Sequence, residues 1–315
     1  MNRSLSLIGL LGWIGLTVHC AHAELPATSS AHTADELWET VATYNAKPLG
    51  EISGLAPSGR VPSVLWSHND SGGEAALHAL DLDGQFLGSV KVLGVENEDW
   101  EDLSAFQYQG KPYLLIADTG DNARQRNAVP LHAIAEPLPN ADGTYTNLEV
   151  KPAWTLTLRY EDGPQDCEAI AVDPESNRVF LLNKDSKTSV IYEAPLLPSP
   201  HQRAAIAKKF AVLPEITNAT GNIAAFFKAG LLGTRATGLD ISPNGRHAAV
   251  LTYTDIRLFT RAEKQPWAKA FAQKPQLIAL PSIYQPEALC FSRDSRSIYV
   301  SSEESPTPLV RYRLK

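Results

Sequence analysis

Short apolar runs, separated by turn residues, recur along this chain. The clearest pair is Leu103–Tyr108 and Pro112–Ala117, with Gly110 and Lys111 between the two runs. Runs bounded in this way predict an antiparallel strand pair. Acidic residues flank the pair on both sides: Asp99, Glu101 and Asp102 before it, Asp118 and Asp121 after it. Because a hairpin returns the chain to the side it left, we expect both acidic groups on one face.

The same pattern occurs five times. Each copy begins with a polar residue, has an aliphatic residue two places later and leads into a turn rich in Pro, Gly, Asn, Asp or Ser. We call the first residues anchors, and they are Ser53, Glu101, Glu168, Thr237 and Glu287, spaced by 48, 67, 69 and 50 residues. Periods of this length, with three or four strands in each unit, are typical of a β-propeller.

Each anchor is followed by a second apolar run that ends in polar residues, and often by a third run. The second runs are Val64–Trp66, Tyr113–Ala117, Val179–Leu182, Ala248–Leu251 and Ile298–Val300. The third runs are Ala76–Leu82, Val129–Ala135, Val190–Ala194, Ile256–Thr260 and Leu309–Leu314. These three runs supply three strands of each predicted unit.

The predicted fold is therefore all-β, a single β-propeller over residues 36–315 with five blades. A sixth, degenerate blade is the alternative, because the two longest spacings contain inserts. One insert, residues 222–232, has apolar residues at helical spacing and predicts a short helix. The last repeat lacks an outer strand, which Trp38–Tyr44 can supply by closing the ring. Glu36–Tyr44 itself is compatible with a short helix or a strand.

The first 23 residues have the features of a secretory signal peptide. Arg3 provides a positive charge, Leu5–Val18 an apolar core, and Ala21–Ala23 a small-residue cleavage site. We expect cleavage after Ala23 and a periplasmic or secreted protein. A lipoprotein attached at Cys20 ranks second, since Thr-Val-His is a poor sequence before the cysteine.

The mature chain is expected to begin with a flexible lead-in, residues 24–35. Loss of Arg3 changes the net charge from −7 to −8. Such an acidic chain is a poor candidate for nucleic acid or anionic membranes and a reasonable one for cations. No further apolar run is long enough to span a bilayer, and we expect a monomer. Cys167 and Cys290 belong to the third and fifth repeats, so we predict that they do not pair.

Carboxylates dominate the expected mouth of the central channel. Three of the five anchors are Glu, whereas the other two are Ser53 and Thr237. The predicted metal ligands are Glu101, Glu168, Glu287, Asp99, Asp118, Asp121 and Asp166. Hard oxygen ligands suit Ca²⁺, with Mg²⁺ as the alternative, and the histidines show no spacing suited to zinc. The competing interpretation is an acidic rim whose Asp residues only form Asx turns.

Three basic residues near the mouth are candidates for binding an anionic substrate: Arg124, Lys184 and Arg235. The alternative is that they are counterions of the acidic rim. His68 and Tyr253 follow second runs on the same face and are candidates for an acid or base, or else ordinary rim residues.

Four segments resemble a family of secreted bacterial β-propellers, related to proteins described as phytase-like or "esterase-like activity of phytase". They are EDWEDLS, IADTGDNARQR, RYEDGPQDCEAIAVDP and ATGLDISPNGRHAAVLTYTD, and the resemblance extends from Ile52 to Glu303. It implies a propeller with an acidic channel mouth that binds Ca²⁺. The plan is also similar to gluconolactonase- and paraoxonase-type propellers, which use a channel calcium to hydrolyse esters or lactones. By that analogy the three anchor glutamates are ligands. Ser53, Thr237 and the scarcity of basic residues depart from a phytase site.

Two functions remain open from the sequence. The first is a Ca²⁺-dependent hydrolase of phosphoesters, esters or lactones, acting on a small anionic or ester substrate. The second is a non-enzymatic propeller that presents its loops to a protein or glycan partner, with any metal being structural.

Overall fold

The structure, a computed structural model, describes residues 37–184, 189–199, 201–214 and 235–314. They all belong to the unit Thr33–Lys315, and almost all regular structure in them is β-strand. The signal peptide and lead-in predicted for residues 1–35, and the helix predicted for 222–232, lie outside the described residues. No helix in the described part of the chain is long and apolar enough to span a bilayer.

The strands form five antiparallel series, which we number along the chain. The first series is β2 (Ile52–Pro57), β3 (Val64–Asn69), β4 (Ala76–Asp81) and β5 (Phe86–Val92), extended by β9 (Leu148–Val150), which is parallel to β5. The second is β6 (Trp100–Tyr108), β7 (Lys111–Asp118), β8 (Val129–Ala135) and β10 (Trp154–Tyr160). The third is β11 (Cys167–Asp173), β12 (Arg178–Asn183), β13 (Val190–Pro195) and β14 (Ala205–Val212).

The last two series complete the arrangement. The fourth is β15 (Ala236–Ile241), β16 (His247–Thr252), β17 (Asp255–Thr260) and β18 (Gln276–Ala279). The fifth is β19 (Pro286–Phe291), β20 (Ser297–Ser302), β21 (Thr307–Arg313) and β1 (Trp38–Tyr44). Strand β1 pairs antiparallel with β21, so the N-terminal segment supplies the outer strand of the last repeat, as predicted.

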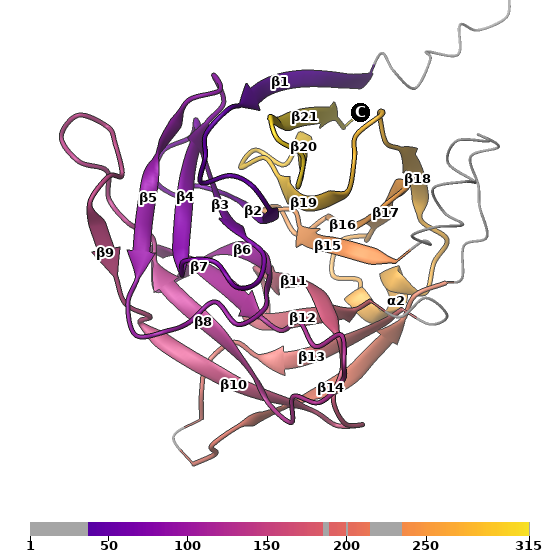
Figure 1. The fold of residues 1–315 in the computed structure, drawn as a ribbon. Helices are drawn as coiled ribbons and strands as arrows, with labels where there is room; N and C mark the ends of the chain where they lie inside the picture. Colours follow the sequence, from indigo (N-terminus) through magenta and orange to yellow (C-terminus); the bar gives the residue numbers. More distant parts are fainter. Residues whose placement is uncertain (1–36, 185–188, 200, 215–234, 315) are drawn as a thin grey trace, which may run out of the picture. The chain divides into compact units, whose positions relative to one another are not determined.

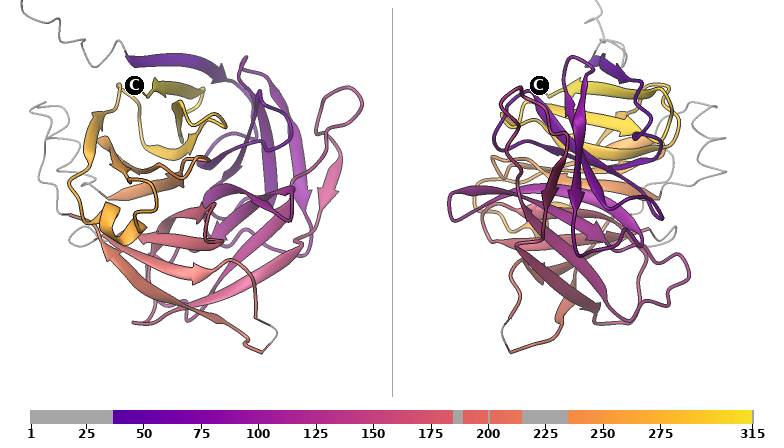
Figure 2. Two further views of the ribbon diagram at one scale, coloured as in Figure 1. Left: turned by 180° about the vertical axis from the view of Figure 1, so that it is seen from behind. Right: turned by 60° about the vertical axis from the view of Figure 1, so that its left-hand side comes forward.

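The first strands of the five series pack side by side in a closed ring, in the order β2, β6, β11, β15 and β19. The later strands of each series lie further out (Figures 1 and 2). This is a β-propeller, which confirms the predicted fold class. The outer strands β10 and β14 pair in parallel, so the second and third series share one eight-stranded sheet. The described residues therefore form four sheets, and the count of five separate blades stays a prediction.

Each anchor is the second residue of a first strand, and each lies at a β-bulge. The register shifts between the residues on either side of the anchor in all five first strands. A bulge redirects the side chain of the extra residue. The aliphatic residues two places later are buried, as predicted; Leu55, Leu103, Ile170, Leu239 and Leu289 are each no more than 2% exposed.

Two carboxylates, the buried Asp102 and the half-buried Asp240, accept amides at the free inner edge of the ring. Asp102 Oδ1 accepts the amide of Leu103 at 2.8 Å, and Oδ2 accepts those of Ile170 at 2.8 Å and Leu239 at 3.4 Å. Asp240 accepts the amides of Ile241 and Phe291, both at 2.8 Å. The innermost strand of each series has no partner on its inner side, and buried amides need an acceptor. Asp102 therefore joins three strands through their amides, and it is not one of the carboxylates of the channel mouth.

Cys167 and Cys290 are both buried free thiols, which confirms that they do not pair. The sequence patterns missed several outer strands, β5, β9, β10, β14 and β18, and the short helix α2 (Trp267–Phe271). Outer strands such as β14 are largely half-buried or exposed, so apolar runs do not mark them. Helix α2 buries Trp267 and Phe271 in the core between the third and fourth series.

Candidate metal centre

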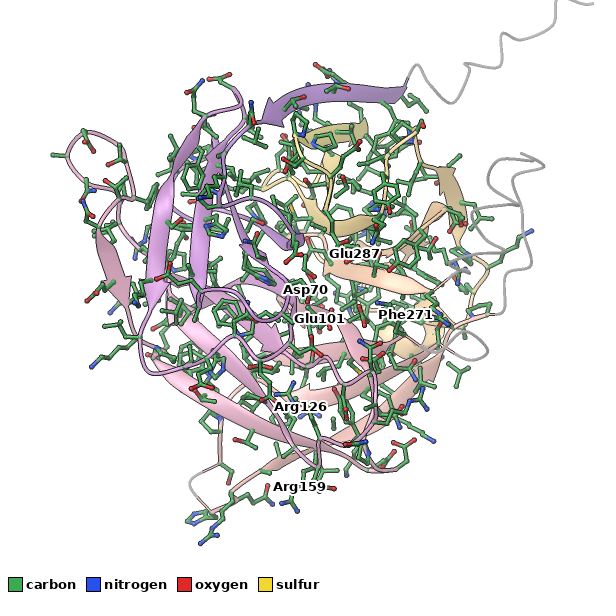
Figure 3. All side chains as sticks on the ribbon, in the orientation of Figure 1. Asp70, Glu101, Arg126, Arg159, Phe271 and Glu287 are labelled. Atoms are coloured by element: carbon green, nitrogen blue, oxygen red, sulfur yellow. The ribbon has the colours of Figure 1, made fainter. Side chains whose placement is uncertain are left out.

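The start of each first strand and the end of each second strand lie at the same end of the ring, which we call the mouth. Bulges at Glu101 and Glu168 aim these two side chains at the same place from neighbouring strands, β6 and β11. Figure 3 places Asp70, Glu101 and Glu287 near the centre of the ring and Arg159 at its outer edge. The mouth is therefore lined by carboxylates, as the sequence predicted.

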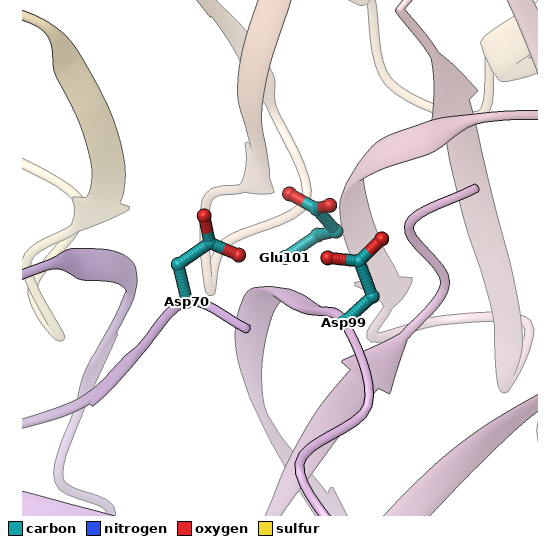
Figure 4. Close-up of side chains that lie close together, drawn as sticks. All are labelled: Asp70, Asp99 and Glu101. Atoms are coloured by element: carbon teal, nitrogen blue, oxygen red, sulfur yellow. The ribbon is translucent and has the colours of Figure 1, made fainter. Parts of the chain in front are cut away.

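Two groups of three carboxylates meet at the mouth and share Glu101. One group is Glu101, Asp166 and Glu168, which are 4%, 8% and 3% exposed. The other is Asp70, Asp99 and Glu101, gathered in Figure 4 with Asp70 on one side and the other two opposite. Within each group, one oxygen from every residue lies within 4.8 Å of the others. Such spacing allows one ion to contact three carboxylates at once.

Gly120 makes this close approach feasible. A Cβ at this position would lie 2.1 Å from Glu101 Oε1 and 2.3 Å from Asp99 Oδ2. Any side chain here would therefore occupy the space of two carboxylates. The amide of Gly120 also donates to the carbonyl of Asp99 at 3.2 Å, which holds the loop against them.

The electrostatics of the mouth oppose three negative charges so close together. Burial, and then the charges of Asp70 and Asp166, raise the pKa of Asp99 to about 6. Burial and the charge of Glu168 raise the pKa of Glu101 well above its usual value. Burial likewise raises the pKa of Glu168 to about 7, against the lowering effect of Lys184. Such groups are stable only with bound protons, basic neighbours or a cation.

One oxygen in the site has no partner while the neighbouring carboxylates are ionised. Glu168 Oε2 accepts a hydrogen bond from Lys184 Nζ at 2.7 Å, but Glu168 Oε1 is buried and no donor reaches it. A buried carboxylate oxygen without a donor is costly. Its neighbours are the other carboxylates of the group, and Glu101 serves as its donor only when protonated, a hydrogen bond that raises the pKa of Glu101 and lowers that of Glu168. A divalent cation fits the same position in place of that proton.

Lys184 is the basic residue at the centre of the site. It follows β12, its side chain is 16% exposed, and it forms an ion pair with Glu168. Although burial disfavours its charge, the Glu168 carboxylate raises the pKa of Lys184. The residue is therefore a charged counterion of Glu168 that also borders the mouth.

Asp118 and Asp121 are held by the loop that follows β7. Asp121 accepts the amides of Gln125 at 2.8 Å and Arg126 at 2.7 Å, as in the Asx-turn interpretation. Asp118 Oδ1 pairs with Arg126 Nη2 at 2.9 Å and accepts the amide of Asp99 at 3.2 Å. The amide of Asp121 also donates to Asp166 Oδ1 at 2.9 Å. Both residues thus orient ligand candidates, and neither falls in a three-carboxylate group.

Glu287 contacts residues outside the two groups of three carboxylates. The hydroxyl of Tyr253 donates to Glu287 Oε1 at 2.7 Å. Burial and then the charge of Glu287 raise the pKa of Glu303 to about 8, and Gln285 Nε2 donates to Glu303 Oε2 at 2.7 Å. The mouth therefore contains a carboxylate pair, Glu287 and Glu303, beside the two groups of three carboxylates.

The remaining predicted site residues are spread out. His68 is 0% exposed, its ring packs edge-on against Trp100, and burial lowers its pKa. Burial and the charge of Glu287 raise the pKa of Tyr253. Arg124 and Arg235 are exposed. Burial and the charge of Asp162 raise the pKa of Tyr192, and the charge of Arg124 opposes that rise. Of the three predicted substrate-binding residues, Lys184 forms an ion pair with a predicted ligand of the two groups, Glu168.

Asp70 and Glu303 were missed as candidate ligands, although a signal for them exists. Each immediately follows the second strand of its series, as Lys184 and Tyr253 do. The residue after the second strand therefore lies at the mouth in these series, next to an anchor. Comparing this position across the repeats, in addition to the anchors, finds both acids.

No family model matches this chain, and no curated protein matches it. Among solved structures, a proposed 6-phosphogluconolactonase from Bacteroides uniformis shares 13% identity, with 86% of this chain and 68% of that chain covered and a TM-score of 0.40. The β-propeller domain of Cps50 (Swd1) from Myceliophteria thermophila shares 11% identity, with coverage of 88% and 100% and a TM-score of 0.45. At these scores neither likeness bears on activity, and the phytase-like resemblance stays a prediction.

Proposed function

We propose that this domain binds a divalent cation, Ca²⁺ foremost, at the mouth of the propeller. The observation that supports the proposal is the oxygen Glu168 Oε1, buried beside Glu101 and Asp166, for which the described residues offer no donor other than a protonated Glu101. A cation there satisfies this oxygen and removes the repulsion that raises the pKa values of the group. Asp70 and Asp99 supply further oxygens from the other side of Glu101.

Calcium suits this donor set better than the common alternatives. All five side chains offer carboxylate oxygens, and Ca²⁺ accepts roughly 6–8 oxygens in flexible geometry. Magnesium requires near-octahedral geometry and retains several waters, while zinc favours nitrogen and sulfur. No histidine or cysteine falls in either three-residue group of the described chain.

We further propose that the loaded site hydrolyses a phosphoester, ester or lactone. A bound Ca²⁺ supplies a Lewis acid that polarises the substrate oxygen. Lys184 lies beside Glu168 and is positioned to hold an anionic group of the substrate. Glu287 and Glu303 form the nearby pair that can exchange a proton, because burial and repulsion place the pKa of Glu303 at about 8.

A non-enzymatic propeller with a structural ion is the second candidate. It is favoured by the burial of His68 and by the hydrogen bond of Tyr253 to Glu287, which leave neither side chain available to solvent as an acid or base. In that case the loops around the mouth present a surface to a protein or glycan partner.

Metal analysis with thermal unfolding tests the cation site. Purified protein should contain calcium or gain it on addition, and millimolar Ca²⁺ should raise the melting temperature while EDTA reverses the change. Glu168→Gln should abolish the shift, whereas Glu263→Gln, at an exposed position remote from any carboxylate group, should retain it. A melting temperature that ignores both Ca²⁺ and EDTA, with no metal bound, overturns the proposal.

Hydrolysis is tested separately. Calcium-loaded protein is assayed with p-nitrophenyl acetate, p-nitrophenyl phosphate and a simple lactone, each with and without EDTA. Chelator-sensitive turnover that Glu168→Gln removes supports the hydrolase. A calcium-dependent melting shift without turnover on any substrate class favours the non-enzymatic function.

A further inference from the structure

The propeller has a pocket at the end of the ring opposite to the mouth. Its walls come from the ends of the first strands and the turns that follow, and it encloses about 270 Å³. The residue six places after each anchor lines it, so all five series contribute one residue at an equivalent position. These residues are Gly59, Gln107, Pro174, Pro243 and Arg293.

Most of the lining is apolar. Phe106 and Tyr113 line one wall and stack on each other, with ring centroids 5.5 Å apart and planes at 22°. Pro174 and Pro243 contribute rigid apolar surface from the third and fourth series. A concave site with apolar walls and a few polar groups is the usual form of a small-molecule pocket. A cavity of about 150 Å³ already accommodates benzene, so this pocket has room for a ring and a substituent.

The charge of the pocket is concentrated on Arg293. Its side chain is exposed, and no hydrogen bond or ion pair joins it to another described residue. At the equivalent position the other series have Gly, Gln or Pro. The one acid in the lining, Asp240, has both oxygens occupied by the amides of Ile241 and Phe291. Arg293 is therefore the basic group of the pocket, and it forms no ion pair with Asp240 or with another described residue.

We propose that this pocket binds a small carboxylate with a flat apolar body, such as an aromatic acid. The guanidinium of Arg293 pairs with the carboxylate, since Arg presents paired donors that match carboxylate geometry. The ring of the ligand packs between the aromatic wall and the prolines. This site is independent of the proposed cation at the mouth, because the two lie at opposite ends of the first strands.

Benzoate and the neutral analogue benzyl alcohol are the probes, titrated into the full-length mature protein and followed by ligand-observed NMR. Benzoate should bind in the millimolar range and more tightly than benzyl alcohol. Arg293→Gln should weaken benzoate roughly three- to tenfold and leave benzyl alcohol unchanged, while Arg293→Lys retains part of the affinity. Arg296→Gln, an exposed arginine of the same turn that does not line the pocket, should bind as wild type.

Three results with wild type and Arg293→Gln overturn the proposal. They are no benzoate binding, benzoate binding that Arg293→Gln does not weaken, and benzyl alcohol binding as tightly as benzoate. Melting curves of every variant confirm folding. Glu168→Gln tests whether the pocket is independent of the mouth, because this variant should abolish the calcium response and leave benzoate affinity intact. Loss of benzoate binding in that variant would place the ligand at the mouth and contradict the assignment to this pocket.

Discussion

Gly120→Ala offers a sharp test of the metal centre, because it removes no ligand. The added Cβ would lie 2.1 Å from Glu101 Oε1 and 2.3 Å from Asp99 Oδ2. Ordinary contact between such atoms is about 3.5 Å, so both carboxylates must move by roughly 1 Å. The clashing atoms are the ends of flexible side chains, so the fold can accommodate the change.

We expect Gly120→Ala to weaken Ca²⁺ binding far more than it changes the stability of the metal-free protein. Calcium–oxygen distances span only about 2.3–2.6 Å, and a site tolerates displacements of about 0.5 Å. Moving two ligands by twice that amount should weaken Ca²⁺ binding by about 10–100-fold, which is about 1.4–2.7 kcal/mol. The stability of the metal-free protein should change by about 1 kcal/mol or less.

Isothermal titration with Ca²⁺ and melting curves in EDTA measure the two quantities. Gly73→Ala is the matched control, because no atom lies within 4 Å of the Cβ it adds. The reasoning fails if Gly120→Ala binds Ca²⁺ within twofold of wild type. It also fails if the metal-free variant melts far below wild type, which would make Gly120 a requirement of the fold.

Three more predictions follow from the same structure. Protons should compete with Ca²⁺, because the pKa values of Asp99 and Glu168 are raised to about 6 and about 7; affinity should fall as the pH is lowered through this range, and a flat profile contradicts this. At Asp99 and Glu168 the metal-free folded state binds more protons than the unfolded chain, so the stability that these two groups contribute should fall as the pH rises from about 4.5 to about 7. The melting temperature of the metal-free protein, measured against that of Glu168→Gln to separate this effect from the opposite one of buried histidines such as His78, should show the fall, and saturating Ca²⁺ should offset it. Asp102→Ala removes the acceptor of three amides from three strands and should cost roughly 3–5 kcal/mol in urea unfolding, whereas Asp102→Asn, which keeps one acceptor, should cost less.

Much of the fold follows from local sequence. Apolar runs and turn residues are short-range signals, so the first, second and third strands of each repeat were identified, and the burial of residues such as Leu103 followed from alternation. The outer strands were missed because they are half-exposed and lack a continuous apolar run. The pairing of β10 with β14 joins segments that only the ring brings together, so no local pattern predicts it.

The candidate site was likewise predicted in part from the sequence and placed in part only by the tertiary structure. The sequence by itself determined that Glu101 and Glu168 occupy one repeat position, because the repeats align without knowledge of the fold. Only the tertiary structure decided that Asp102, one residue later, turns to the amides of neighbouring strands, and that Glu287 pairs with Tyr253 outside both groups. Those outcomes depend on bulge geometry and on partners far apart in the chain. Repeat position fixes where a residue lies on the ring, and contacts across the ring determine which side chains share a site.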